Sequence, residues 1–172
     1  MSQITEQIWI GSYVDICDEQ FLEDRQIDHI ICCEDELALR AGFPYSDTIV
    51  GYKVHLTDNP NEKTKDALIE GATKLNEWIT QGHRVYLYCF PGINNSVAVV
   101  IAYFMIFKGW TYSTAHTQIK HMRWQANVTP DYAAVLMEFN ITHHSSSLIS
   151  APSVHSATSA PSAPSVVAAL GL

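Results

Sequence analysis

Positive charge is scarce in this sequence of 172 residues, where 10 Lys and Arg stand against 18 Asp and Glu and the formal net charge is −8. A uniformly acidic surface repels phosphate backbones, so this balance disfavours general binding to nucleic acid or to anionic membranes. Any phosphorylated ligand would need a local site that works against the global field. The hydrophobic content of 47% predicts a globular domain with a substantial core.

Cysteine is also sparse, with four residues in the chain, and none of them forms a C-x-x-C pair or joins a His/Cys cluster with zinc spacing. We therefore predict no metal site and expect free, buried thiols in a reducing compartment. The beginning of the chain lacks the basic and apolar regions of a signal peptide, and the apolar run over 97–107 is too short to span a bilayer. These absences favour a cytoplasmic protein without a membrane span, with the nucleus as the alternative.

A change in composition divides the chain. Residues 1–144 are predicted to fold as one domain, whereas residues 145–172 are rich in Ser, Ala and Pro and have no amphipathic period, which indicates a disordered tail. The apolar end of the tail, VVAALGL, could serve as a docking peptide, although a frayed terminus is the simpler interpretation.

Strands and helices alternate through the middle of the domain. Strands are predicted at 7–12, 27–33, 52–56 and 84–88, and helices at 18–26, 64–81, 96–108, 111–123 and 129–140. Thr129 and Pro130 form a strong helix start, and Gly109 is typical of a helix end. The pattern predicts an α/β fold with a central, mostly parallel sheet flanked by helices.

The segment YCFPGINNS, residues 88–96, joins the last predicted strand to an apolar helix. A strand that ends in a glycine-containing loop and feeds a helix makes an anion site, because loop amides and the helix N-terminus point at the ligand. Cys89 at the start of such a loop is expected to favour its thiolate form and to act as a nucleophile. Gly92 permits the tight turn. Ser96 places a hydroxyl where it can donate to the sulfur.

This segment resembles the signature loop His-Cys-x-x-Gly-x-x-Arg-Ser/Thr of the dual-specificity phosphatases, within the Cys-based protein tyrosine phosphatase superfamily. The resemblance extends to IWIGSYVD, to VHLTDNP and to the helix after the loop, and covers residues 3–142. It implies a catalytic set of Cys89 as nucleophile, Asp58 as general acid and Ser96 as support for the sulfur. It further implies that no metal or other cofactor is needed, that the partner is a phosphorylated protein or peptide, and that the phosphoryl oxygens are held by the loop residues Phe90, Gly92, Ile93, Asn94 and Asn95.

Three positions depart from the family's loop. Asn95 replaces the arginine that would give two charged hydrogen bonds to a phosphoryl group, Tyr88 replaces histidine, and Pro91 has no N–H to donate. The sequence therefore predicts an impaired phosphatase, a pseudophosphatase that acts by binding. Two alternatives stay open, a weak or specialised Cys-dependent phosphatase and a protein–protein scaffold without a phosphate site. Asp58 could also form an Asx turn, the substrate could be a phosphoinositide or an RNA 5′ phosphate, and the oligomeric state is not indicated.

Overall fold

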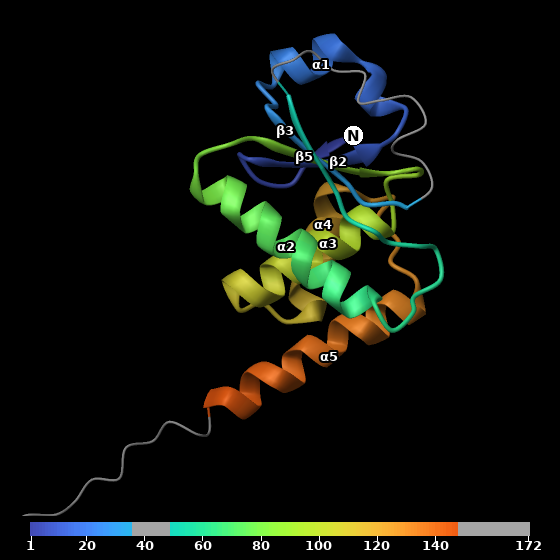
Figure 1. The fold of residues 1–172 in the computed structure, drawn as a ribbon, viewed down its shortest axis with the longest axis vertical. Helices are drawn as coiled ribbons and strands as arrows, with labels where there is room; N and C mark the ends of the chain where they lie inside the picture. Colours follow the sequence, from blue (N-terminus) through green and yellow to red (C-terminus); the bar gives the residue numbers. More distant parts are fainter. Residues whose placement is uncertain (36–48, 148–172) are drawn as a thin grey trace, which may run out of the picture.

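The structure is a computed structural model that describes residues 1–35 and 49–147 (Figure 1). Its centre is a five-stranded sheet in the order β1-β2-β5-β3-β4. The β1 strand is antiparallel to β2, and every other neighbouring pair is parallel. The mostly parallel sheet predicted from the sequence is confirmed. The strands are β1 (Ser2–Gln3), β2 (Ile8–Ser12), β3 (His29–Cys32), β4 (Val50–Lys53) and β5 (Val85–Cys89).

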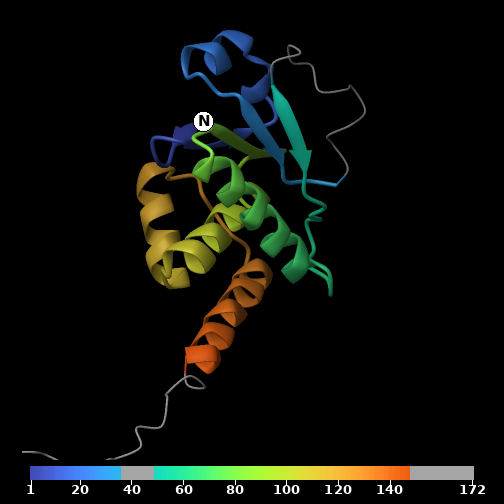
Figure 2. The same cartoon turned by 60° about the vertical axis from the view of Figure 1, so that its left-hand side comes forward.

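Helices cover both faces of this sheet, as Figure 2 shows. Alternate residues of β5 separate the two cores, because Leu87 and Cys89 enter the larger one and Tyr86 and Tyr88 the smaller one. The smaller core lies under η1 (Asp15–Cys17) and α1 (Glu19–Asp24). The larger core lies under α2 (Thr64–Thr80), α3 (Asn95–Lys108), α4 (Tyr112–Met122) and α5 (Pro130–Ser147).

The α3 helix is the most enclosed element of the fold, because its residues from Asn95 to Met105 are all buried. It packs against α2, α4, α5 and the sheet. The helix ends at Gly109, which adopts the left-handed conformation with φ of +67°. The first residues of α3 follow directly from the loop at Cys89, so the loop lies between the central strand and the central helix.

The predicted element boundaries need correction at two places. The strand expected at 52–56 is β4 at Val50–Lys53, because only these residues pair with β3. Val54 and Leu56 are buried in the larger core after the strand has ended, and this burial produced the apparent alternation. The two-residue strand β1 was too short to be recognised. The α5 helix runs to Ser147, so residues 145–147, which the composition assigned to the disordered tail, are helical; residues 148–172 of that tail lie outside the described residues.

Two further observations bear on the sequence predictions. All four cysteines are free, but Cys17 is exposed whereas the other three are buried, so the expectation of buried thiols is wrong for Cys17. Its place on the short η1 helix at the surface explains the difference. None of the helices in residues 1–35 and 49–147 combines the length and the apolar character needed to cross a membrane.

Candidate active site

Cys89 ends the central strand of the sheet. It pairs in register with Ser12 of β2, and its neighbour Tyr88 pairs with Cys32 of β3. The side chain of Cys89 is buried, and its Sγ lies 3.4 Å from Oγ of Ser96 in the first turn of α3. A hydroxyl at this distance can donate to the sulfur, so the sequence's pairing of these two residues is reproduced by the fold.

The loop backbone is shaped by one glycine. Gly92 has φ of +66°, and a Cβ built on it would lie 2.3 Å from the carbonyl oxygen of Gly11 in β2. No side chain fits at that distance, so the close approach of loop and strand requires glycine. The N–H of Tyr13 donates to the carbonyl of Cys89 at 3.1 Å and ties the start of the loop to the same segment.

Arg123 supports the backbone of the loop. Its guanidinium is buried, donates through Nε to the carbonyl of Gly92 at 2.7 Å and through Nη1 to Oγ of Ser2 at 3.3 Å. The N–H of Asn127 donates to the carbonyl of Ile93 at 2.8 Å. Arg123 is therefore a bracing residue. The next residue, Trp124, is 76% exposed and does not brace the core.

A neutral, buried side chain fills the position at which the resemblance to the phosphatase signature predicts arginine. Asn95 is 1% exposed, and its Oδ1 accepts a hydrogen bond from Nδ2 of Asn94 at 3.0 Å. Oδ1 of Asn94 in turn accepts from the N–H of Thr129 at 3.0 Å, where α5 is about to begin. The two asparagines thus join the loop to α5.

A pocket of about 320 Å³ lies beside the loop and is acidic. Three carboxylates line it, from Glu34, Asp35 and Asp58, together with Leu56, Thr57 and Asn59, and none of these described lining residues is Lys or Arg. Glu34 links the pocket to the loop, because its Oε2 accepts a hydrogen bond from the N–H of Phe90 at 2.5 Å. The carboxylate of Glu34 is therefore hydrogen-bonded to the N–H of Phe90, which the resemblance assigned to a phosphoryl oxygen.

Tyr132 of α5 holds the segment that carries Asp58. Its hydroxyl donates to the carbonyl of Thr57 at 2.7 Å, and the residue is fully buried. Burial raises the pKa of Tyr132 well above its ordinary value, and neighbouring acidic groups raise this pKa further. The phenol consequently stays protonated and remains a hydrogen-bond donor.

Tyr88 takes no part in this arrangement. The residue is 3% exposed, and its ring packs in the smaller core, 6.3 Å from the ring of Tyr13 and 6.4 Å from that of Tyr86 between centroids. Its side chain lies on the face of the sheet opposite to that of Cys89. Tyr88 is therefore a residue of the smaller core.

Comparison with known proteins identifies the fold and the family. The family model for the dual specificity phosphatase catalytic domain matches residues 8–142, which is more than half of the chain. The chain belongs to the dual specificity phosphatase family. The chain is similar to dual specificity protein phosphatase 1B of Arabidopsis thaliana, with 27% identity over 139 residues that cover 81% of each chain.

Other members of the dual specificity phosphatase family show the same likeness. Dual specificity protein phosphatase 15 of mouse is 26% identical over 81% of this chain, which spans 57% of that relative's length. Among solved structures, the human tyrosine phosphatase-like serine/threonine/tyrosine-interacting protein superposes with a TM-score of 0.75 at 23% identity, covering 84% of this chain and 97% of the human one. At that identity the structural likeness shows the fold alone.

Within this dual specificity phosphatase fold, the predicted site residues fall into two groups. Cys89, Ser96 and the loop residues Phe90, Gly92, Ile93, Asn94 and Asn95 lie together between β5 and α3. Asp58 lies on an exposed bend and lines the adjoining pocket, and its role as general acid stays a prediction. Sequence reasoning missed Glu34 and Tyr132. Glu34 follows β3 directly, and the carboxyl ends of neighbouring parallel strands share one edge of the sheet, which is the signal that could have found it.

Proposed function

We propose that this dual specificity phosphatase-like domain is catalytically impaired and acts by binding a phosphorylated protein or peptide in the cytoplasm or nucleus. The observation that carries the proposal is the buried, neutral Asn95 at the position where the family's signature has arginine. A guanidinium gives a phosphoryl group two parallel charged hydrogen bonds. An asparagine that is short, uncharged and already bonded to Asn94 cannot replace them.

The free energy lost with the arginine decides whether phosphate binding and catalysis are impaired or only slightly changed. Charged hydrogen bonds contribute about 1.5–3 kcal/mol each, so the loss of two removes roughly 3–6 kcal/mol of phosphoryl stabilisation. That free energy corresponds to a factor of roughly 100 to 10,000 in binding or rate. The carboxylates of Glu34, Asp35 and Asp58 add repulsion toward a dianion in the same pocket.

Restoring the missing cation tests the proposal. We expect Asn95→Arg to raise hydrolysis of an aryl phosphate by about two orders of magnitude or more, and Asn95→Gln, which adds length without charge, to leave it at the wild-type level. Circular dichroism of both variants checks that the loop region has not unfolded. The proposal is wrong if the wild-type protein already turns over substrate at the level reached by Asn95→Arg and Cys89→Ser abolishes that turnover, because the chain is then an active enzyme.

A weak Cys-dependent phosphatase is the second candidate. The 3.4 Å approach of Ser96 Oγ to Cys89 Sγ and the place of Asp58 in the adjoining pocket favour it, because a nucleophile and a possible proton donor are retained. In that case Cys89 attacks phosphorus, and Asp58 protonates the departing oxygen and then takes a proton from the hydrolytic water. The result expected for this candidate is a slow turnover that is lost in both Cys89→Ser and Asp58→Asn.

A scaffold without a phosphate site is the third candidate, and the hydrogen bond from Phe90 N–H to Glu34 favours it. A ligand that binds the native state must raise its melting temperature. Tungstate or a phosphopeptide that stabilises the wild-type protein supports the binding function, and the absence of any shift at saturating concentrations supports the scaffold.

A further inference from the structure

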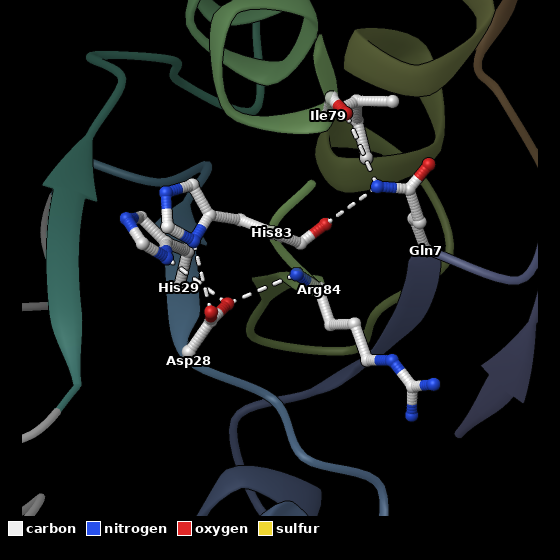
Figure 3. Close-up of polar contacts among 6 residues, drawn as sticks. All are labelled: Gln7, Asp28, His29, Ile79, His83 and Arg84. Atoms are coloured by element: carbon white, nitrogen blue, oxygen red, sulfur yellow. Dashed lines mark hydrogen bonds and ion pairs between the residues drawn. The ribbon is translucent and has the colours of Figure 1, made fainter. Parts of the chain in front are cut away.

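A second group of polar side chains gathers at the opposite edge of the sheet from Cys89. Asp28 and His29 stand at the start of β3, and His83 lies in the turn between α2 and β5 (Figure 3). One ligand atom from each residue lies within 4.8 Å of the other two. Because His83 precedes the end of β5 by six residues, the cluster lies roughly 20 Å from the loop along the strand. It is therefore separate from the phosphatase site.

The two imidazoles converge on one carboxylate, as Figure 3 shows. Nδ1 of His29 lies 3.0 Å from Oδ1 of Asp28, and Nδ1 of His83 lies 2.9 Å from Oδ2 of the same residue. The ring centroids of the histidines are 3.9 Å apart. A tetrahedral ion with metal–nitrogen distances of about 2.0–2.1 Å keeps its ligand atoms about 3.3 Å apart. The two nitrogen–oxygen distances, which involve different oxygens of Asp28, fall within a few tenths of an ångström of that value, and all three ligand atoms lie within 4.8 Å of one another.

The surroundings hold these side chains in place. The ring of His29 is buried against Trp78, at 4.4 Å between centroids. The N–H of Arg84 donates to Oδ1 of Asp28 at 2.9 Å. Nε2 of Gln7 donates to the carbonyls of His83 and Ile79, each at 3.1 Å, and so ties the turn that carries His83 to the end of α2. Such supporting contacts orient the ligands of protein metal sites.

We propose that Asp28, His29 and His83 bind a divalent transition-metal ion of the Zn²⁺ class. Two imidazole nitrogens and one carboxylate form a donor set suited to Zn²⁺, Co²⁺, Ni²⁺ or Cu²⁺, with water in the remaining position. The partial exposure of Asp28 and His83 gives that water access. When the metal takes Nδ1, the proton that lay between that nitrogen and the carboxylate moves to Nε2 of the same ring, and no redox step is involved. The net charge of −8 attracts cations to the surface.

The ion would join two segments that are far apart in the chain. His83 lies 55 positions after Asp28, which is why a search for metal-ligand spacing in the sequence found nothing. An ion held by both segments clamps the beginning of β3 to the turn before β5. Its expected effect is on the stability of the fold, without participation in chemistry at Cys89.

Metal binding by the full chain tests the proposal directly. After chelator treatment, we expect saturable uptake of one equivalent of Zn²⁺ by calorimetry, and a melting temperature raised by about 5–10 °C at a Zn²⁺ concentration of a hundred times Kd. Co²⁺ should give the visible absorption of a tetrahedral nitrogen and oxygen site. A strong sulfur-to-cobalt charge-transfer band would place the ion on cysteine and overturn the proposal.

Matched histidine variants locate the site. His83→Gln should abolish the melting shift, whereas His116→Gln removes a histidine that stacks on Tyr112 in α4 and should leave it unchanged. Equal binding by both variants, or no saturable binding by the wild type at millimolar Zn²⁺, would refute the site. Imidazole nitrogen NMR on the unaltered protein decides the case if His83→Gln fails to fold, since Zn²⁺ must shift only the signals of His29 and His83.

Discussion

Replacing Glu34 by glutamine should strengthen the binding of phosphate-like anions to the loop. The carboxylate of Glu34 accepts a hydrogen bond from the N–H of Phe90 at 2.5 Å, and it lines the acidic pocket beside the loop. A phosphoryl oxygen that uses the same N–H would have to displace this carboxylate or share the donor with it. Glutamine keeps the size and the hydrogen-bonding atom of the side chain but removes the charge.

The magnitude follows from the geometry. Two oxygens that share one N–H donor lie about 4 Å apart. Unit charges at about 4 Å repel by about 1 kcal/mol in bulk water and by about 4 kcal/mol at an effective dielectric constant of 20. Glu34 is partly exposed, so its effect falls between these limits. The predicted gain in affinity is about 5-fold to 1,000-fold, and it should shrink as salt is added because solvent screens part of the interaction.

Calorimetric titration with tungstate at pH 7 measures this gain. Asp35→Asn is the matched control, because Asp35 lines the same pocket but its carboxylate already contacts Nδ1 of His55 at 2.7 Å and Nζ of Lys53 at 3.5 Å. The carboxylate of Asp35 contacts no loop amide among the described residues, so removing its charge should change the affinity less than removing that of Glu34, which contacts the N–H of Phe90. The reasoning is refuted if Glu34→Gln binds tungstate no more tightly than the wild type, or if both variants gain equally.

Three other changes test the framework of the site. Gly92→Ala should lower the free energy of unfolding by at least about 2 kcal/mol in urea denaturation, because φ is positive and the new Cβ would meet the Gly11 carbonyl. An alanine variant as stable as the wild type would contradict the loop geometry. Arg123→Gln should cost about 1.5–3 kcal/mol in the same assay through the lost charged hydrogen bond to Gly92, and an unchanged midpoint would show that Arg123 does not brace the loop. The hydrogen bond to Glu70 raises the pKa of Tyr52 from 10.0 to about 12, so the contribution of this bond to stability is complete below pH 10 and is lost as pH rises toward 12. Melting curves of Tyr52→Phe should lack that part of the alkaline loss of stability. Identical pH profiles of the variant and the wild type would exclude this contribution.

Most of the fold was predictable because its elements carry strong local signals. The continuous apolar run of α3, the Thr129–Pro130 helix start and the left-handed Gly109 each specify structure within a few residues. The boundaries of β4 were not predictable, since strand pairing with β3 rather than the pattern of buried residues determines them.

The candidate site divides in the same way. Cys89, Gly92 and Ser96 lie within one segment of eight residues, so their proximity follows from the sequence alone. The contact between Glu34 and Phe90 depends on β3 and β5 being neighbours in register, which is a tertiary property. The hydrogen bond from the N–H of Thr129 to Oδ1 of Asn94 likewise requires α5 to start beside the loop.

The bonds that anchor the loop to Tyr13, Arg123 and Asn127 all use its carbonyl oxygens. Those anchors are independent of whatever the loop amides hold, so the backbone can keep the contour of an enzyme whether or not an anion is present. Substitutions of side chains at the opening of the site should therefore leave the stability of the domain unchanged. The same independence makes the chain a ready template for redesign, in which the side chains of the loop are exchanged on an unchanged backbone.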